Sequence, residues 1–445
     1  MDTAWQKLSP DEKMERRFAA WLAAEDIEFA SPEAEADYKA RVQRLADAVR
    51  LQKTPDRVPV YPSIGAFDAY YAGFTSQDMM YDAEKAVAAA IKCTLDFQAD
   101  ARLGAAGLPG KALEILNYKL YHWPGHGVGP NDGLQFVEGE YMTADEYDAL
   151  MEDPTDFWLR TYFPRTIGEL EGLSLLSPQA YVRTGIGRTL ASFGQPEVQV
   201  ALEKLAAAGR EARAWQEKMA AGSKRLEELG FPSFGAGSST HAPFDVIGNA
   251  LRGTREVMMD IFRRPEKLLE AIERITPAVT RMGLAGANRL GRSPIVMVTL
   301  HKGADGFMSL EQYKRFYWPG LRKVIYGLIE EGFVPHLFAE GAYASRLEVI
   351  RDDLPKGKTI WHFDYTDMAL AKEIIGDRAC MMGNVPVAMM HAGTPDQVTA
   401  YCRELIDTAG KGGGFILAGG ATVDRNGKAE NIHAMVRCAK EYGLY

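Results

Sequence analysis

Histidines recur within or just after short apolar runs in the C-terminal half of the chain. His301 follows IVMVTL, His336 lies in FVPHLF and His362 lies in TIWHF. Buried imidazoles need hydrogen-bonding partners, and they gather where protons are moved or metals are bound. Other polar residues follow these three apolar runs and the next run along the chain. They are Lys302, Asp305, Glu340, Asp364 and Asn384. The pattern predicts a proton-handling or metal-binding site built by consecutive strands.

A second candidate site lies in the segment from Asn117 to Met142. Its ring-bearing side chains stand among glycines and prolines, which is typical of a loop; they include Tyr118, His122, Trp123 and His126, which we take as candidate substrate-binding residues. Such a loop either covers a planar ligand or packs its rings into a small core of its own. Both hypotheses stay open. The Pro-Gly between His122 and His126 excludes the helical spacing of a metal site.

Alternating strands and helices are needed to bring the first set of residues together. The apolar runs at 295–300, 333–338, 359–363, 379–382 and 415–418 are separated by segments of helical periodicity at 310–330, 345–353, 368–375 and 397–409. This alternation predicts a parallel sheet whose polar strand ends meet at one edge. A (β/α)8 barrel and a doubly wound sheet both fit. No G-x-G-x-x-G follows these strands, which disfavours dinucleotide binding.

The first 55 residues are expected to form a helical extension ahead of one domain at 56–445. Ser9 and Glu12 have the S-x-x-E spacing of a capping box, and a second helix is predicted over 31–51. The first strand is predicted at Val58–Tyr61. The extension is either an arm on the domain or a dimer contact. Further along, alanines and charges at 202–230 predict a pair of solvated helices, acting as a lid or an oligomer contact.

Composition excludes several classes of protein. The 445 residues carry 51 Lys and Arg against 60 Asp and Glu, a net charge of −9, which argues against a nucleic-acid or anionic-membrane partner. No apolar run approaches the ~20 residues of a membrane span, and no secretory leader is recognisable. Four widely spaced cysteines predict buried thiols rather than disulfides or a zinc knuckle. We therefore expect a cytoplasmic protein. The run KGGGFILAGG lacks the G-K-[ST] of a phosphate loop and is interpreted as a turn before a strand.

Several motifs in a fixed order resemble the uroporphyrinogen decarboxylase superfamily. They are RVPV at 57–60, APFD at 242–245 followed by LRG, FMSLEQYKRFYWP, PHLFAEG, MMGNVP, GTPDQV and ENIHAMV. The resemblance covers nearly all of the chain after residue 55. It implies a single (β/α)8 barrel with its active site in the mouth at the carboxyl ends of the strands. Its two activities are decarboxylation of the acetate arms of uroporphyrinogen and methyl transfer to or from a corrinoid cobalt.

Departures from the decarboxylase pattern are informative. That enzyme has an arginine-rich R-Q-A-G-R loop after its first strand, where guanidinium groups pair with substrate carboxylates. Here the loop is YPSIGAFDAYY, without arginine, and the expected S-D pair after the second strand falls on Ala106 and Gly107. A substrate with many carboxylates would find few partners. The resemblance is therefore closer to the corrinoid-dependent methyltransferase branch, in which Ser238 and Asp245 lie near the mouth.

The thiol-specific methyltransferases of that branch use zinc held by a His-x-Cys and a later Cys. His336 matches the histidine, but Phe338 stands at the first cysteine and Gly420 or Ala421 near the second. The soft sulfur ligands that zinc prefers are missing, so zinc is doubtful. A harder metal site built on His336 and Glu340, with His362 or Asp364 as a further ligand, stays open.

What the resemblance then implies is corrinoid-dependent methyl transfer from a small non-thiol substrate, for example O-demethylation of a methoxy compound. The leaving oxygen must be protonated, and the candidate catalytic residues are His336, Glu340, His362 and His301. Substrate-binding roles fall to Lys302, Asp305, Asp364 and Asn384, with Asn384 expected to donate a hydrogen bond to a carbonyl. No D-x-H-x-x-G cobalamin motif occurs in the chain, so the cobalamin is expected on a separate carrier protein. Alternatives are a decarboxylase or lyase acting on a small organic acid or tetrapyrrole-like substrate, and a non-catalytic tetrapyrrole-binding protein, which the polar mouth disfavours.

Overall fold

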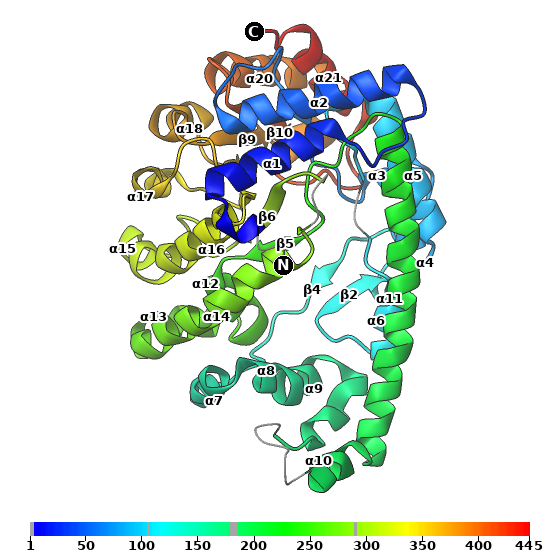
Figure 1. The fold of residues 1–445 in the computed structure, drawn as a ribbon, viewed down its shortest axis with the longest axis vertical. Helices are drawn as coiled ribbons and strands as arrows, with labels where there is room; N and C mark the ends of the chain where they lie inside the picture. The colour runs from blue at the N-terminus through cyan, green and yellow to red at the C-terminus, as the bar shows by residue number, and fades with distance from the viewer. Residues whose placement is uncertain (1–3, 105–106, 179–185, 289–291) are drawn as a thin grey trace.

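The computed structural model describes residues 4–104, 107–178, 186–288 and 292–445. The chain has an α/β fold around a seven-stranded parallel sheet (Figure 1). Its strands, in spatial order, are β1 (Val60–Tyr61), β10 (Phe415–Gly419), β9 (Cys380–Val385), β8 (Ile360–Phe363), β7 (Val334–Ala339), β6 (Ile295–Leu300) and β5 (Ser239–His241). The predicted parallel sheet and the positions of its C-terminal strands are confirmed.

Helices follow the strands and cover the outer face of the sheet. They include α12 (Pro243–Asp245), α13 (Thr254–Arg263), α14 (Pro265–Ala285), α15 (Leu310–Gln312), α16 (Trp318–Glu330), α17 (Leu347–Asp353), α18 (Met368–Ile375), α19 (Val387–Ala392), α20 (Pro395–Thr408) and α21 (Ala429–Glu441). Ser309 and Thr394 form the predicted capping boxes at α15 and α20. Each box satisfies orphan amides of the first helical turn, which fixes where the helix begins. Figure 1 shows these helices arranged in an arc along the strands.

Side chains alternate between the two faces of each strand. On β6, Val296, Val298 and Leu300 point outward into the main core that the helices share. Ile295 points inward, and so do Met297 and Thr299 by the period of two. Residues paired across parallel strands share a face, so Met297 places its partner His336 on the inner face as well.

The N-terminal extension closes one end of the inner face. Helices α1 (Pro10–Ala23) and α2 (Pro32–Arg50) begin at Ser9 and Ser31, and the capping box between Ser9 and Glu12 is confirmed. Their apolar sides carry Trp21 and Leu45, which pack in one cluster with Ile295 and other inward residues from the starts of the strands. The N-terminal helices therefore pack at the amino ends of the strands, and we call the region at the opposite, carboxyl ends the mouth.

The two edge strands, β1 and β5, are connected by hydrogen bonds through residues outside the named strands. The Asp100 N–H donates to the Val60 carbonyl at 3.0 Å, and the Arg102 N–H donates to the Pro232 carbonyl at 2.9 Å. The Ala236 N–H in turn donates to the Ile295 carbonyl at 2.7 Å. The segment around Ala101 thus lies between β1 and the chain that leads into β5.

The middle of the chain departs from the prediction. Residues 202–230 do not form a pair of helices: α11 (Pro196–Glu228) is one continuous helix that runs along one side of the molecule (Figure 1). Its alanine-rich face packs on α5 (Ala83–Phe97) and α6 (Gly110–Leu116), where Gly222 meets Val87 closely. The helix contains no proline after its first turn that would kink it.

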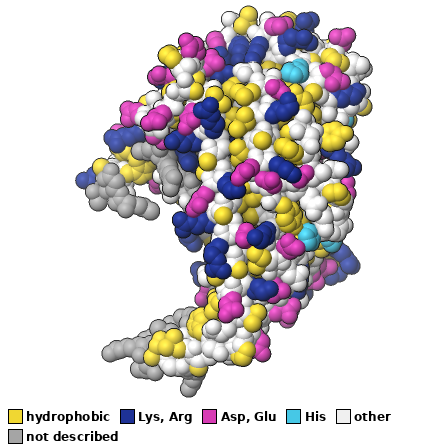
Figure 2. Space-filling model, turned by 90° about the vertical axis from the view of Figure 1, so that its right-hand side faces the viewer, with side chains coloured by type: hydrophobic (Ala, Val, Ile, Leu, Met, Phe, Trp, Pro, Cys, Tyr) yellow, Lys and Arg dark blue, Asp and Glu magenta, His cyan; other side chains and the backbone are white. Residues whose placement is uncertain are grey.

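Short helices complete this part of the chain: α3 (Phe67–Tyr71), α4 (Asp78–Tyr81), α7 (Tyr147–Glu152), α8 (Pro154–Phe157), α9 (Phe163–Thr166) and α10 (Ile186–Phe193). Seen from the side, acidic and basic side chains alternate over the surface (Figure 2). All four cysteines are buried free thiols. Within the described residues, no helix has both the length and the apolar character needed to span a bilayer.

Candidate active site

His336 and His362 lie on the inner face, in β7 and β8. His336 is the third of the six residues of β7 and sits below the strand end where the sequence pattern placed it, whereas His362 is the last but one of the four residues of β8. Both are buried. Their rings are parallel, with 5.3 Å between centroids, and the edge of Phe234 packs against His336.

A directed chain of hydrogen bonds links the two rings to the backbone. His362 Nε2 lies 2.7 Å from the Gly419 carbonyl oxygen, and His336 Nε2 lies 3.2 Å from His362 Nδ1. A carbonyl only accepts, so His362 carries its proton on Nε2 and accepts at Nδ1. His336 must then donate from its own Nε2. Its Nδ1 is left as a hydrogen-bond acceptor.

Burial keeps both imidazoles neutral. Desolvation lowers the pKa of His362 to about 4, with the bond to Gly419 opposing it. Desolvation and the adjacent His362 lower the pKa of His336 well below its ordinary value. Near pH 7 the pair therefore offers an acceptor to a ligand, and neither ring is well suited to act as an acid.

The loop after β6 carries His301 and Lys302, and Asp245 holds its backbone. The fully buried carboxylate of Asp245 accepts from the His301 N–H at 2.8 Å and from the Lys302 N–H at 2.9 Å. The Tyr317 hydroxyl donates to the same carboxylate at 2.6 Å. Three donors fix its position, so Asp245 positions the loop. Ser238, the other residue expected near the mouth, donates to the Gly283 carbonyl at 2.7 Å.

Asn249 joins the two side chains of this loop. It lies on a π-helical turn, Val246–Leu251, a distortion often found at functional sites. The Lys302 ammonium donates to Asn249 Oδ1, so the Asn249 amide nitrogen, 2.6 Å from His301 Nδ1, donates to that ring. Neutral His301 consequently carries its proton on Nε2. Burial lowers the pKa of the Lys302 amine, which Asp245 and Glu138 partly offset.

Glu340 follows β7 at the open side of the mouth. Its Oε1 lies 3.8 Å from His301 Nε2, and its side chain is 47% exposed. Desolvation raises the pKa of this carboxyl, His301 opposes the shift, and Asp245 and Asp364 add to it. The protonated form of Glu340 is therefore favoured more than that of an ordinary glutamate, as a proton donor requires.

Asp364 and Asn384 lie at the ends of β8 and β9. Asp364 accepts from the Gly341 N–H at 3.2 Å, and desolvation raises the pKa of its carboxyl. Asn384 Nδ2 donates to the carbonyls of Asp364, at 3.2 Å, and Thr366, at 2.8 Å. The Asn384 amide protons are thus occupied, while its buried Oδ1 meets no donor in the described part of the chain. Asn384 is therefore placed to accept a hydrogen bond from a ligand, not to donate one as the sequence analysis expected.

Asp305 stands apart from this cluster. Its carboxylate accepts from the Ser345 hydroxyl at 2.8 Å and lies 3.3 Å from the Arg346 guanidinium. Its N–H donates to the Ala342 carbonyl at 2.8 Å. These contacts join the loops after β6 and β7, so they give Asp305 a structural role.

Two residues of the cluster escaped the sequence analysis. His241, at the end of β5, bonds through Nδ1 to the Thr299 hydroxyl, and its ring lies 6.3 Å from that of His301. Desolvation and His301 lower the pKa of His241. β5 has only three residues after a Gly/Ser run, so it lacked a strand pattern, although His241 directly precedes APFD. Asn249 lies four residues after Asp245, and this helical spacing is the one sequence signal that could have identified it.

The aromatic segment forms a small sheet of β2 (Tyr121–Pro124), β3 (Gly127–Val128) and β4 (Gln135–Phe136). Trp123 is buried, donates to the Tyr81 hydroxyl at 3.1 Å and stacks on His126 at 4.6 Å. Tyr118 stacks on Tyr121 at 5.8 Å, and His122 is exposed. Such ring packing favours the hypothesis of a small internal core.

The same segment nevertheless reaches two sides of the mouth. Glu138 accepts from the Thr254 N–H and lies near Lys302, while Asp132 pairs with Arg425 at 2.8 Å. Arg425 follows β10, whereas Lys302 follows β6. The segment therefore forms part of the wall around the strand ends.

The residues present do not form the zinc site of the thiol methyltransferases. Phe338 packs on His362 at 4.8 Å between centroids, in the place of a sulfur ligand. Nowhere in the described ranges do three His, Cys, Asp or Glu side chains gather closely enough to hold a metal ion. His336 and Glu340 thus gain no third ligand for the harder site.

Comparisons with known proteins agree with this architecture. Residues 227–442 match the family described as uroporphyrinogen decarboxylase (URO-D). The uroporphyrinogen decarboxylase of Methylococcus capsulatus is 24% identical over 207 residues, 46% of this chain and 57% of that protein. That of Psychromonas ingrahamii is 25% identical over 209 residues, with the same coverage. The match thus spans a little over half the length of these relatives.

Among solved structures, a methyltransferase from Methanosarcina mazei has the same fold. The TM-score is 0.57 with 16% sequence identity, over 90% of this chain and 98% of the other. The family match contains β5 to β10 and every histidine, carboxylate and amide of the cluster at the mouth. Through residues 227–442, the chain belongs to the uroporphyrinogen decarboxylase family.

Proposed function

We propose that this protein transfers a methyl group from a small non-thiol substrate, such as a methoxy compound, to a corrinoid. The observation that carries the proposal is Glu340, a carboxyl of raised pKa beside His301 at an open mouth. The fold likeness to a methyltransferase supports the same class of reaction. The alkoxide or phenolate leaving group of an ether is poor, so such a transfer needs a positioned proton donor.

The rim of the mouth fits a large planar group. Phe307 and Tyr365, 42% and 76% exposed, follow β6 and β8, and Tyr70, 62% exposed, lies on α3 after β1. Exposed rings suit the apolar face of a macrocycle presented from outside. When bound there, the corrinoid supplies the nucleophilic cobalt that takes the methyl group. The proposed partner is a separate corrinoid carrier protein.

The residues of this chain would then divide the remaining work. Protonated Glu340 gives its proton to the leaving oxygen, and the Nε2–H of His301 faces the carboxylate that this leaves behind. The buried acceptors, His336 Nδ1 and Asn384 Oδ1, orient donor groups on the substrate. Lys302 offers a cation to a substrate carboxylate or to developing negative charge.

Decarboxylation of uroporphyrinogen finds less support. The loop of residues 62–72 after β1 contains no arginine. Within the described residues, no arginine forms a hydrogen bond or ion pair with His301, Lys302, Glu340 or Asp364. The loop after β1 therefore offers none of the guanidinium groups expected to form bidentate pairs with a polycarboxylate substrate.

A carboxy-lyase acting on a smaller acid is the second candidate. It is favoured by Lys302, whose buried amine with a lowered pKa lies among the polar groups of the mouth. A single cation in a desolvated site binds one carboxylate and stabilises a carbanion formed by loss of carbon dioxide. Release of carbon dioxide without any requirement for corrinoid would select this function.

We also propose that the strands close into a (β/α)8 barrel. The backbone hydrogen bonds of Asp100 and Arg102 link β1 to the residues before β5. The segment at 99–103 would then be the member of the ring that lies between those two edge strands. The N-terminal helices lie at the other end, where a homodimer contact is a further proposal, testable by sedimentation velocity.

The experiment is an anaerobic titration of the protein with photoreduced cobalamin and a panel of methoxylated aromatics, followed by visible absorption. We expect a protein-dependent spectral change with at least one donor. Glu340→Gln should slow it by about 10²- to 10⁴-fold, the usual effect of removing a general acid. The matched control is Glu311→Gln, an 82% exposed glutamate on α15. Equal rates for the Glu340 variant and the control would refute the acid assignment.

If no compound of the panel reacts, binding of cobalamin to the protein is measured next. No spectral change and no retention of cobalamin by the protein would reject the methyltransferase proposal. Carbon dioxide release from small organic acids would then be measured. Loss of that release in Lys302→Met would establish the lyase.

A further inference from the structure

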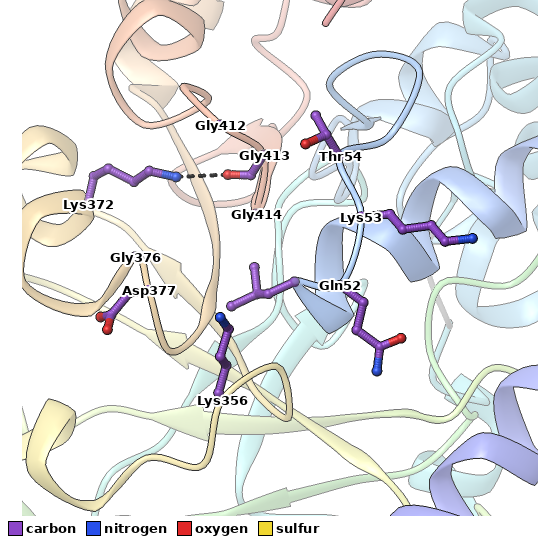
Figure 3. Close-up of a pocket in the computed structure, with 11 residues that line it drawn as sticks. Gln52, Lys53, Thr54, Lys356, Lys372, Gly376, Asp377, Gly412, Gly413 and Gly414 are labelled. Atoms are coloured by element: carbon purple, nitrogen blue, oxygen red, sulfur yellow. Dashed lines mark hydrogen bonds between the residues drawn. The ribbon is translucent and has the colours of Figure 1, made fainter.

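A cavity of about 220 Å³ lies at the opposite end of the strands from the mouth (Figure 3). Its walls come from segments that precede β1, β8, β9 and β10, far apart in sequence. They contribute Lys53, Lys356, Lys372, Asp377 and the glycines at 412–414. None of these residues belongs to the cluster at the mouth.

The cavity has an excess of positive charge. Neither Lys53 nor Lys356 forms an ion pair or hydrogen bond within the described part of the chain. Figure 3 shows the Lys356 ammonium directed into the cavity and the Lys53 ammonium directed away from it, so Lys356 and Lys372 supply the charge. Lys372 is half-buried and donates to the Gly413 carbonyl at 2.8 Å, and it meets no carboxylate among the residues that the structure describes. Desolvation lowers the pKa of its amine. The one acidic residue of the lining, Asp377, lies 3.6 Å from the guanidinium of Arg378.

Backbone amides add to this cation cluster. Gly412, Gly413 and Gly414 have φ values of +77°, +87° and +71°, a left-handed run that side chains with a Cβ rarely adopt. The Gly413 N–H donates to the Gly410 carbonyl at 2.9 Å. Over the described ranges, the N–H groups of Gly412 and Gly414 find no acceptor, although Gly414 is buried. A buried amide without a partner is rare, and such groups often bind anions.

We propose that this cavity binds a phosphate group, either inorganic phosphate or the phosphate of a small phosphomonoester. Lysine ammoniums and unpaired glycine amides are the donors that hold phosphate in proteins. The run KGGG lacks the motif of a phosphate loop. The lysines of this cavity, Lys356 and Lys372, come instead from other segments of the chain. Their approach to the glycines exists only in the folded protein.

Binding here is separate from the proposed reaction. The segments around the cavity lead into β8, β9 and β10, whose other ends carry His362, Asn384 and Gly419. The phosphate therefore sits beneath the mouth without entering it. We expect it to stabilise the fold whether or not corrinoid or substrate is present.

The test is isothermal titration of the full-length protein with inorganic phosphate, with glycerol phosphate as the phosphomonoester and chloride as the non-specific anion. Saturable phosphate binding is expected, weakened about tenfold or more in Lys356→Gln, where one charged hydrogen bond is lost. Lys372→Gln should weaken phosphate binding to a similar extent. Lys323→Gln, an exposed lysine on α16, is the control and should bind as the native protein does.

Each outcome decides the proposal. Tighter binding of glycerol phosphate than of inorganic phosphate would identify a phosphomonoester as the ligand, and the reverse would identify the free ion. No saturable binding up to about 10 mM, in the weak millimolar range of affinity, would overturn the proposal. Binding that Lys356→Gln and Lys323→Gln affect equally would overturn it too. Lys356 is exposed, so its substitution leaves the fold intact, and a thermal melt verifies this.

Discussion

Asp245 provides the sharpest test of how the mouth is built. Its carboxylate is fully buried and accepts three hydrogen bonds, from the N–H groups of His301 and Lys302 and from the Tyr317 hydroxyl. Asp245→Asn keeps the shape but turns one oxygen into an NH₂ group. Whichever way the amide is oriented, a donor then faces a donor.

The expected cost follows from these contacts. At least one charge-assisted hydrogen bond is lost, worth about 1.5–3 kcal/mol, and the facing N–H is left buried without an acceptor at about 1–3 kcal/mol. Because the two effects overlap, we expect the free energy of unfolding to fall by about 2–5 kcal/mol. The loop that carries Lys302 also shifts, so activity should fall with stability.

The assay is urea unfolding followed by fluorescence and circular dichroism, with Glu311→Gln as the control for a surface carboxyl near the same loop. Coincident transitions are needed for the free energies to be compared. A loss of less than about 0.5 kcal/mol, the range of ordinary surface substitutions, would refute the positioning role. So would a normal stability together with unchanged turnover.

Two further predictions concern buried charge. Acidification should destabilise the protein through His362: its folded pKa of about 4 lies below the unfolded value of 6.5, so only the unfolded state gains a proton in between. The free energy of unfolding then falls by roughly 3 kcal/mol as pH drops from about 6.5 to 4. When unfolding is measured across that range, the dependence of this free energy on pH should be weaker in His362→Gln. An equal dependence in the variant and the native protein would contradict the neutral pair. Arg252→Met should cost about 3–5 kcal/mol, because Asp260, fully buried and 2.7 Å from Arg252 Nε, would lose its main cation. Denaturant midpoints measure this, and removing both charges in Arg252→Met with Asp260→Leu should recover part of the loss.

Much of the framework could be predicted because it depends on local patterns. Apolar runs of strand length marked β6 to β10, and capping residues such as Ser309 and Thr394 marked where helices begin. The recurrence of histidines in successive strand segments also predicted that His336 and His362 lie close together. β5, by contrast, was missed because three residues after a glycine-rich run carry no periodicity. Likewise, the composition of residues 202–230 fits either one long helix or a pair of shorter ones. Packing against α5 and α6 decides that α11 is a single helix.

The sequence by itself determined the alternation of strands and helices, the family of the C-terminal half and the set of polar residues at the strand ends. Tertiary structure decided what those residues can do. The neutral state of His336 and His362, the raised pKa of Glu340 and the Asn249 bridge arise from desolvation and from hydrogen bonds between distant segments. The lysine-lined cavity likewise exists only where the segments preceding four strands meet. Hydrogen bonding and desolvation depend on distances in space, which local sequence patterns do not encode.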